Sequence, residues 1–183
     1  VETSSFQLEQ IDTFRPWIAV MLNFSPDHLD RHPSVEAYGR AKARIFENQR
    51  DTDWAVINAD DPAVLDLARG ARARAKYFAR ETPLDAGVVV EGGWIVERRS
   101  GGTERLVPLD AIHLIGGHLV TDVMAAAAVS SIAGAASNAM TEAVDAFRGL
   151  EHAMELVADA DGVRFVNDSK ATNVVSALRS IES

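Results

Sequence analysis

Three short stretches of the chain gather side chains of the kinds that bind metal ions and phosphates. They are "ETSS" at residues 2–5, "NFSPDHLDRH" at residues 23–32 and "NDSKATN" at residues 167–173. Carboxylate and imidazole groups can hold Mg²⁺, usually with water in the remaining positions, and a lysine can meet an anionic substrate. The three stretches are therefore candidates for a metal site and an anion site.

Each stretch also has a purely structural explanation. Asp27 and Asp30 suit a loop and the entry to a helix. Asp168 and Ser169 suit the cap of a last helix, with Lys170 as an exposed charge. The spacing of these residues alone does not decide between chemistry and structure.

The composition is that of a globular, acidic chain. Its 183 residues, 47% of them hydrophobic, are enough to bury a core. The net charge of -9, from 27 acidic and 18 basic residues, argues against a nucleic-acid surface or a basic membrane patch. The absence of cysteine excludes disulfides and thiolate metal sites. Because the sequence shows no signal peptide and no long apolar segment, we expect a soluble, cytoplasmic protein.

The elements that would position these side chains alternate between strand and helix. Short apolar runs that suit buried parallel strands occur at residues 16–24, 53–61 and 75–80. Helical spacing occupies residues 34–49, with Ser34 placed as the cap, and residues 62–70, which begin with proline. This alternation is typical of βαβ units, whose sheets bind ligands at the carboxyl ends of the strands.

The second half of the sequence follows a different pattern. Residues 85–109 predict short strands, with a tight hairpin at Gly92-Gly93. A buried Ala-rich helix, a capped amphipathic helix, a hairpin around Asp161-Gly162 and a last helix follow, at residues 116–134, 137–150, 154–169 and 173–183. We expect an α/β fold in three layers, with a mostly parallel sheet flanked by helices and a small antiparallel β region.

Four segments, in this order, resemble the Mur ligase family. They are "ETSSFQLE", "LNFSPDHLDRH", "YGRAKARIFEN" and "VNDSKATN", and the resemblance runs from the first residues to the last. It is strongest to the branch that adds D-glutamate to UDP-N-acetylmuramoyl-L-alanine in peptidoglycan synthesis, forming ADP. The resemblance implies a central, ATPase-type domain at residues 1–149 without its phosphate-loop segment, and the start of the C-terminal ligase domain at residues 150–183.

The resemblance also implies a metal site. Glu2 and His28 would help to hold Mg²⁺ at the ATP phosphates, and Lys42 would join them as a carbamate. A lysine ammonium, with an ordinary pKa near 10.4, repels a cation, whereas its carbamate is an anionic oxygen ligand. Local chemistry alone favours a solvated helix charge at Lys42. By the same resemblance, Lys42, His28 and Lys170 are the expected catalytic residues.

The "NDSKATN" segment would hold the reactants. Asp168 is expected to contact ATP, Lys170 to lie near the reacting phosphate and carboxylate, and Thr172 to contact D-glutamate. Ser169 and His28 are the other expected substrate contacts. Such phosphoryl transfer depends mainly on positioning and charge neutralisation, so no serine or cysteine nucleophile is required.

Several positions depart from the family pattern. No G-x-x-x-x-G-K-[ST] sequence is present. Leu119 and Asp122 stand where the family has asparagines, and His152-Ala153 stands where it has His-Arg. Asp122 and His152 therefore occupy cofactor-binding positions, but the missing Arg removes charge-assisted hydrogen bonds worth about 1.5 to 3 kcal/mol each. We expect poor ATP binding, or none.

Three functions remain open on the sequence. The chain is part of a ligase that is inactive alone, a non-catalytic ligase-like module with a degraded ATP site, or a metal-dependent hydrolase using Glu2, Asp27, His28 and Asp30. In the first case the partners are UDP-N-acetylmuramoyl-L-alanine, D-glutamate and ATP, with Mg²⁺ as cofactor. A homodimer through surfaces exposed by truncation is also expected.

Overall fold

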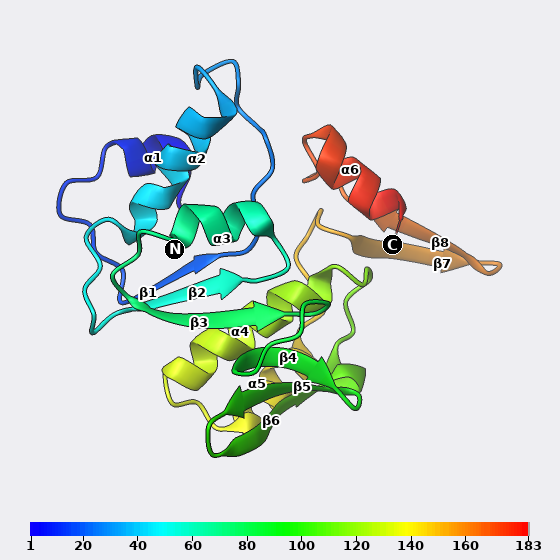
Figure 1. Cartoon of the computed structure of the whole chain (residues 1–183). Coiled ribbons are helices and arrows are strands. Elements are labelled where there is room, and N and C mark those ends of the chain that lie inside the picture. Colours follow the sequence, from blue (N-terminus) through cyan, green and yellow to red (C-terminus); the bar gives the residue numbers. More distant parts are fainter. Residues whose placement is uncertain (183) are drawn as a thin grey trace.

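A mixed six-stranded sheet forms the centre of the molecule. The computed structural model describes residues 1–182, and Ser183 lies outside the described residues. The strands follow one another in sequence order: β1 (Ile18–Met21), β2 (Trp54–Asn58), β3 (Arg74–Ala79), β4 (Gly87–Glu91), β5 (Trp94–Arg99) and β6 (Gly102–Pro108). Strands β1 to β4 are parallel, whereas β4, β5 and β6 are antiparallel (Figure 1). The expected mostly parallel sheet with a small antiparallel region is confirmed.

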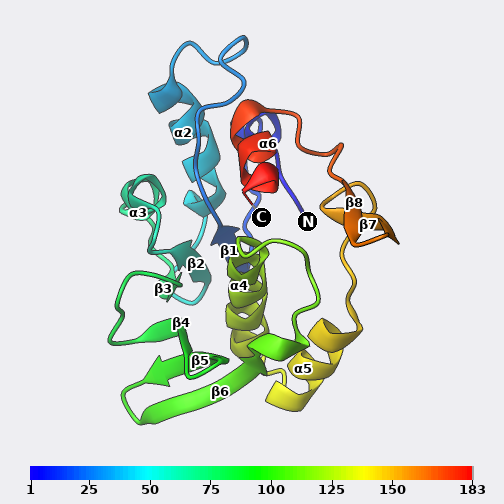
Figure 2. The same cartoon turned by 90° about the vertical axis from the view of Figure 1, so that its right-hand side faces the viewer.

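Helices cover both faces of this sheet. The elements around it are α1 (Ser5–Glu9), α2 (Val35–Ala43), η1 (Arg44–Phe46), α3 (Pro62–Ala68), η2 (Leu109–Ala111), α4 (Leu119–Ile132) and α5 (Ser137–Ala146). Along β2, Ala55 and Ile57 pack into one core with Val64 of α3, whereas Val56 packs into the other core with Met124 of α4. Figure 2 shows β2 and β3 between α3 and α4. The three-layer expectation is thereby confirmed.

A separate hairpin and helix follow residue 150. The two antiparallel strands β7 (Glu155–Ala160) and β8 (Val163–Asn167) form a sheet of their own, and α6 (Val174–Ile181) comes next. Their turn lies at Asp161-Gly162, where both residues have positive φ, as a tight hairpin requires. Figure 1 shows this unit standing apart from the main sheet. The division into domains at residues 149 and 150 stays a prediction.

Two expectations about helices need correction. The helix beginning at Ser34 is capped as predicted, with the Ser34 hydroxyl accepting from the Ala37 N–H, but regular α-helix ends at Ala43 and a 3₁₀ turn follows. The helix at Ser137 has no side-chain cap, because its N-cap residue is Ala136. Among the described residues, no helix is long and apolar enough to cross a membrane.

Candidate functional site

A cleft of about 850 Å³ lies at the carboxyl ends of β1, β2 and β3, between the main sheet and residues 150–182. This is the edge at which open α/β sheets bind ligands. The lining residues come from the loops after β1, β2, β3 and β8, from the start of α4, from the entry to the β7–β8 hairpin, and from α6 and the residue after it. They are Asn23, Phe24, Ser25, Asn58, Asp60, Asp61, Pro62, Arg80, Glu81, Gly117, His118, Leu119, Thr121, Asp122, Ala153, Met154, Asp168, Lys170, Ala171, Ser176, Ser180 and Glu182.

Two neighbouring aspartates hold the strand-end loops in place. Asp61 caps α3 by accepting from the N–H groups of its first turn, and its other oxygen accepts from the Phe24 N–H at 2.8 Å. Asp60 accepts from the backbone N–H groups of residues 80–82. Burial alone would raise the pKa of Asp60, but these hydrogen bonds outweigh burial and lower it. The β2 end and the β3 end are therefore fixed to each other.

Arg80 braces the start of α4. Its guanidinium donates to the carbonyl of Gly117, in the turn that leads into the helix. Sequence reasoning missed this residue, although its place at the carboxyl end of a predicted strand was a usable signal. One turn into α4, desolvation raises the pKa of Asp122, and nearby His118 opposes that shift. The α4 side of the cleft thus presents an arginine and an aspartate.

The "NDSKATN" segment forms a closed loop on the other side of the cleft. One Asp168 oxygen accepts from the Met154 N–H at 3.0 Å, and the other accepts from the Ser180 hydroxyl of α6. The Lys170 N–H donates to the His152 carbonyl. His152 and Met154 both adopt positive φ, of 66° and 49°. Asp168 therefore joins the hairpin entry to α6, a role that depends on partners that sequence reasoning did not identify.

Two groups of the predicted residues lie together, one lining the cleft and one around Tyr38. Asp122, Asp168 and Lys170 line the cleft together, and the two departures at Leu119 and Ala153 line it as well. His152, Ser169 and Thr172 are not among the lining residues. The Asn167 side chain lies 2.8 Å from Nδ1 of His152, and the Ser169 N–H donates to the Asn167 side chain, so His152 and Ser169 support the loop.

The second group surrounds Tyr38. The Lys42 ammonium lies 5.7 Å from the centre of the Tyr38 ring, and the His28 ring lies 6.0 Å from it. His28 has a positive φ of 54°, and its N–H donates to the Asp27 carboxylate. The Asp27 carboxylate also accepts from the side-chain amide of Asn173, so the segment after β1 contacts the start of α6.

The predicted metal ligands do not form a closed cluster among the described residues. Within residues 1–182, no three His, Asp or Glu side chains gather closely enough to hold a metal ion. Glu2 is exposed, and His28 has its nearest acidic partner in Asp27, 4.0 Å away. Mg²⁺ usually keeps several waters and takes only one or two protein carboxylates beside substrate phosphates. The Glu2 carboxylate is a donor of the type that Mg²⁺ takes, and its joint role with the His28 imidazole stays a prediction.

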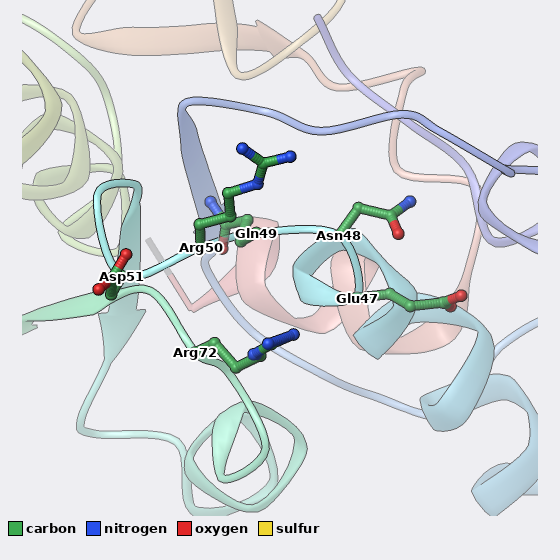
Figure 3. A pocket seen from close by; sticks show the side chains of 6 residues that line it. All are labelled: Glu47, Asn48, Gln49, Arg50, Asp51 and Arg72. Atoms are coloured by element: carbon green, nitrogen blue, oxygen red, sulfur yellow. The ribbon is translucent and has the colours of Figure 1, made fainter.

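A second, smaller pocket of about 480 Å³ lies at the amino ends of β2 and β3. Figure 3 shows its lining side chains, among them Arg50, Arg72 and Gln49. Gln49 is buried and donates to the Pro16 and Trp54 carbonyls, while its own oxygen has no partner among the described residues. None of the residues predicted from the sequence lines this pocket.

Comparison with known proteins gives close relatives. Residues 1–130 match the Mur ligase middle domain. The chain is 44% identical over 182 residues to the UDP-N-acetylmuramoylalanine–D-glutamate ligase of Pelotomaculum thermopropionicum, and 46% identical over 185 residues to that of Acidobacterium capsulatum. Both alignments cover 100% of this chain, but the chain spans only 40% of the length of each relative.

Solved structures of related ligases share the fold. MurF from Acinetobacter baumannii superposes with a TM-score of 0.69 at 18% identity, covering 90% of this chain and 36% of that one. A pseudomurein peptide ligase type C from Methanothermus fervidus gives 0.65 at 18% identity, covering 90% and 40%. With the family model matching 130 of the 183 residues, the chain belongs to the Mur ligase family and carries its middle domain.

Proposed function

We propose that this chain is the central part of an ATP-dependent, cytoplasmic ligase that adds D-glutamate to UDP-N-acetylmuramoyl-L-alanine in peptidoglycan synthesis. The observation that carries the proposal is the cleft in which Asp168 and Lys170, from the "NDSKATN" loop, meet the strand ends of the main sheet. Relatives named as D-glutamate ligases align with the whole chain at 37% to 46% identity, which supports the choice of amino acid.

In the proposed reaction, the terminal phosphoryl group of ATP passes to the L-alanyl carboxylate and gives an acyl phosphate. The D-glutamate amine then attacks the acyl carbon, an amide forms, and phosphate leaves. The Lys170 ammonium, which reaches the cleft from the "NDSKATN" loop, offsets negative charge near the phosphate and the carboxylate. Thr172 and Ser169 contact D-glutamate, with His28 as a further substrate contact. Asp168, His152 and Asp122 occupy the nucleotide positions.

Mg²⁺ is the proposed cofactor. Glu2 and His28 would hold it, together with Lys42 as a carbamate, and the bound ion would neutralise phosphate charge. Lys42 contributes a ligand only after its amine has lost a proton and added carbon dioxide. The Lys42 amine lies beside the Tyr38 ring, 5.7 Å from its centre.

The rest of the proposal concerns organisation. Residues 1–149 form the ATPase-type domain, and residues 150–183 begin the ligase domain that follows it. Large apolar side chains are exposed on the latter part, including Leu156, Phe165 and Leu178. We propose that these exposed apolar side chains also bring two copies of the chain together as a homodimer. Sedimentation over a range of protein concentrations would measure the association.

A second candidate is a ligase-like module that has lost its nucleotide site. It is favoured by Leu119 and Asp122, which both line the cleft. An aspartate there adds negative charge where an anionic nucleotide would bind. The retention of Glu2, His28, Lys42 and Lys170 favours the ligase instead.

A chimera separates the two candidates. The matching 182-residue stretch of the Pelotomaculum relative is replaced by this chain, and phosphate release is measured with ATP, Mg²⁺ and UDP-N-acetylmuramoyl-L-alanine, with and without D-glutamate. Phosphate release that depends on D-glutamate supports the ligase. The matched control carries Leu119→Asn, Asp122→Asn and Ala153→Arg.

The control makes a negative result informative. Activity in the triple variant but not in the unsubstituted chimera indicates a degraded nucleotide site and supports the module. Inactivity of both, in chimeras that bind UDP-N-acetylmuramoyl-L-alanine normally, contradicts the proposed ligase function.

A further inference from the structure

His32 is a buried histidine, and both of its ring nitrogens contact residues of α1. Only 4% of the residue is exposed. Nε2 lies 3.0 Å from the Ser5 hydroxyl, and Nδ1 lies 3.4 Å from the Glu9 carboxylate. Because a carboxylate can only accept, the arrangement is satisfied when Nδ1 carries the proton and Nε2 accepts from Ser5. The imidazole therefore binds the first and the last residue of α1.

The order Ser5, His32, Glu9 resembles the arrangement of a hydrolase triad, but it lacks access. Ser5 is 1% exposed, so no substrate carbonyl can reach its hydroxyl. The contacts around it are those of a structural clamp. Phe6 of α1 stacks on the His32 ring, with centroids 5.4 Å apart and planes within 2°.

The clamp touches all three segments that carry the proposed metal ligands. Glu2 lies three residues before Ser5, the first residue of α1, which His32 holds. The His32 N–H donates to the His28 carbonyl at 3.0 Å, closing the turn that presents His28. The His32 ring also lies 5.2 Å from the Tyr38 ring, one helical turn before Lys42 on the same face of α2.

Arg44 also holds the C-terminal end of α1. The Arg44 guanidinium donates to the carbonyl of Glu9 at 2.6 Å and to that of Ile11 at 2.9 Å. Arg44 follows α2 directly, so α1 is fixed to the Lys42 helix at its end and to the His28 turn through His32. A five-residue helix has little stability of its own, and these contacts define its position.

We propose that His32 is a positioning residue that sets the relative arrangement of Glu2, His28 and Lys42, and through it the affinity for a divalent metal and the carbamylation of Lys42. The roles of those three residues rest on the proposed function, whereas the clamp on α1 does not. Supporting residues behind metal ligands typically change metal affinity by about 10- to 100-fold when substituted.

Two variants of the full 183-residue chain separate hydrogen bonding from packing. His32→Phe keeps an aromatic ring against Phe6 and Tyr38 but removes the hydrogen bond to Ser5 and the polar contact with Glu9. His32→Gln can donate to Glu9 and accept from Ser5, so it restores the polar contacts. The matched control is His113→Phe, because His113 also pairs with a carboxylate, at 2.8 Å from Asp145, but lies on the surface elsewhere.

Three measurements are made on each variant: amide hydrogen exchange of residues 4–11 by mass spectrometry, Mn²⁺ affinity by electron paramagnetic resonance, and the carbamate signal after addition of ¹³C-bicarbonate by NMR. For His32→Phe we expect exchange in α1 to rise about 10-fold, Mn²⁺ affinity to fall about 10-fold and the carbamate signal to disappear. His32→Gln should recover to within about 3-fold of the unsubstituted chain. His113→Phe should match it.

Unchanged exchange in α1 for His32→Phe overturns the clamp. Faster exchange with unchanged Mn²⁺ affinity and an unchanged carbamate signal overturns the positioning role. If the unsubstituted chain binds no Mn²⁺ and shows no carbamate, the metal part of the proposed function fails, and the exchange result alone still decides whether His32 holds α1.

Discussion

The Asn173 side chain binds Asp27 across 146 residues of sequence: its amide nitrogen lies 3.2 Å from the Asp27 carboxylate. The same side chain uses its oxygen to accept from the Ser176 N–H, at 2.9 Å, as the N-cap of α6. One residue thus starts the last helix and connects it to the segment that carries His28. This connection brings the "NDSKATN" loop to the strand-end cleft.

Substitutions at Asn173 should separate these two roles. Asn173→Asp keeps a capping oxygen but replaces the donor with a carboxylate that repels Asp27, so we expect α6 to persist and its connection to residues 23–32 to loosen. Asn173→Ala should loosen both, at a cost of about 1 kcal/mol to the helix. Hydrogen exchange of residues 23–32 and 174–182 checks both outcomes. Equal protection of residues 23–32 in Asn173→Asp and in the unsubstituted chain would count against the role of this contact.

ATP binding should be weak in this chain. Leu119 and Ala153 line the cleft without polar groups, and Asp122 adds a negative charge. We expect Mg-ATP to bind with a Kd above about 1 mM in isothermal titration. Leu119→Asn, Asp122→Asn and Ala153→Arg together should tighten binding, because an arginine to phosphate contact is worth about 1.5 to 3 kcal/mol. Micromolar binding by the unsubstituted chain would refute the prediction.

The control for charge is Asp110→Asn, at an exposed position outside the cleft, which alters the net charge equally and should leave binding unchanged.

The pKa of Asp122 is raised by desolvation, so its carboxyl takes up a proton at a higher pH than an ordinary aspartate. The affinity for ATP should therefore increase as the pH is lowered, and Asp122→Asn should remove that increase.

Much of the scaffold was predictable because it depends on local pattern. The apolar runs of β1, β2 and β3 and the tight turns at Gly92-Gly93 and Asp161-Gly162 lie where the sequence predicted them, since each needs only neighbouring residues. Asp168, Lys170 and Asp122 line one cleft, but their expected roles toward ATP and the substrates stay predictions.

Features that depend on distant partners were not predictable. Helix α1 at "SFQLE" begins at a capping box of Ser4 and Gln7, which is a local signal, but contacts from the distant residues His32 and Arg44 hold this five-residue helix in place. The brace from Arg80 to Gly117 and the bonds from Asp168 to Met154 and Ser180 likewise join residues that no local pattern relates.

The two helix starts at serine give a stability test. Ser34 caps α2 through its hydroxyl, whereas Ser137 is the first residue of α5 and forms no capping bond. Ser34→Ala should lower the free energy of unfolding by about 1 kcal/mol, and Ser137→Ala by much less. Urea denaturation at neutral pH measures both. Equal losses would show that the difference in capping has no energetic consequence.

A buried ion-pair network fixes the far end of α4 to the sheet. Glu97 of β5 is 4% exposed and accepts from Lys76 of β3 at 2.6 Å, from Arg99 at 2.8 Å and from the Ser131 hydroxyl of α4. Burial alone would raise the pKa of Glu97, but the hydrogen bonds from Arg99, Lys76 and Ser131 outweigh it and lower the pKa to about 2.

This lowered pKa predicts a pH dependence of stability. Because the folded pKa is below the ordinary value of 4.5, the contribution of Glu97 is fully present above about pH 4.5 and is lost as the pH falls toward 2. The shift corresponds to about 3 kcal/mol, of which about 2 kcal/mol should be lost between pH 7 and pH 3. Glu97→Gln should be less stable than the unsubstituted chain by about 3 kcal/mol at pH 7, and the difference should shrink by about 2 kcal/mol at pH 3.

Glu91→Gln is the control, because Glu91 forms an exposed pair with Arg98. Urea denaturation at both pH values decides the point: a difference that stays constant with pH would mean that the Glu97 carboxylate is not stabilised by its three donors.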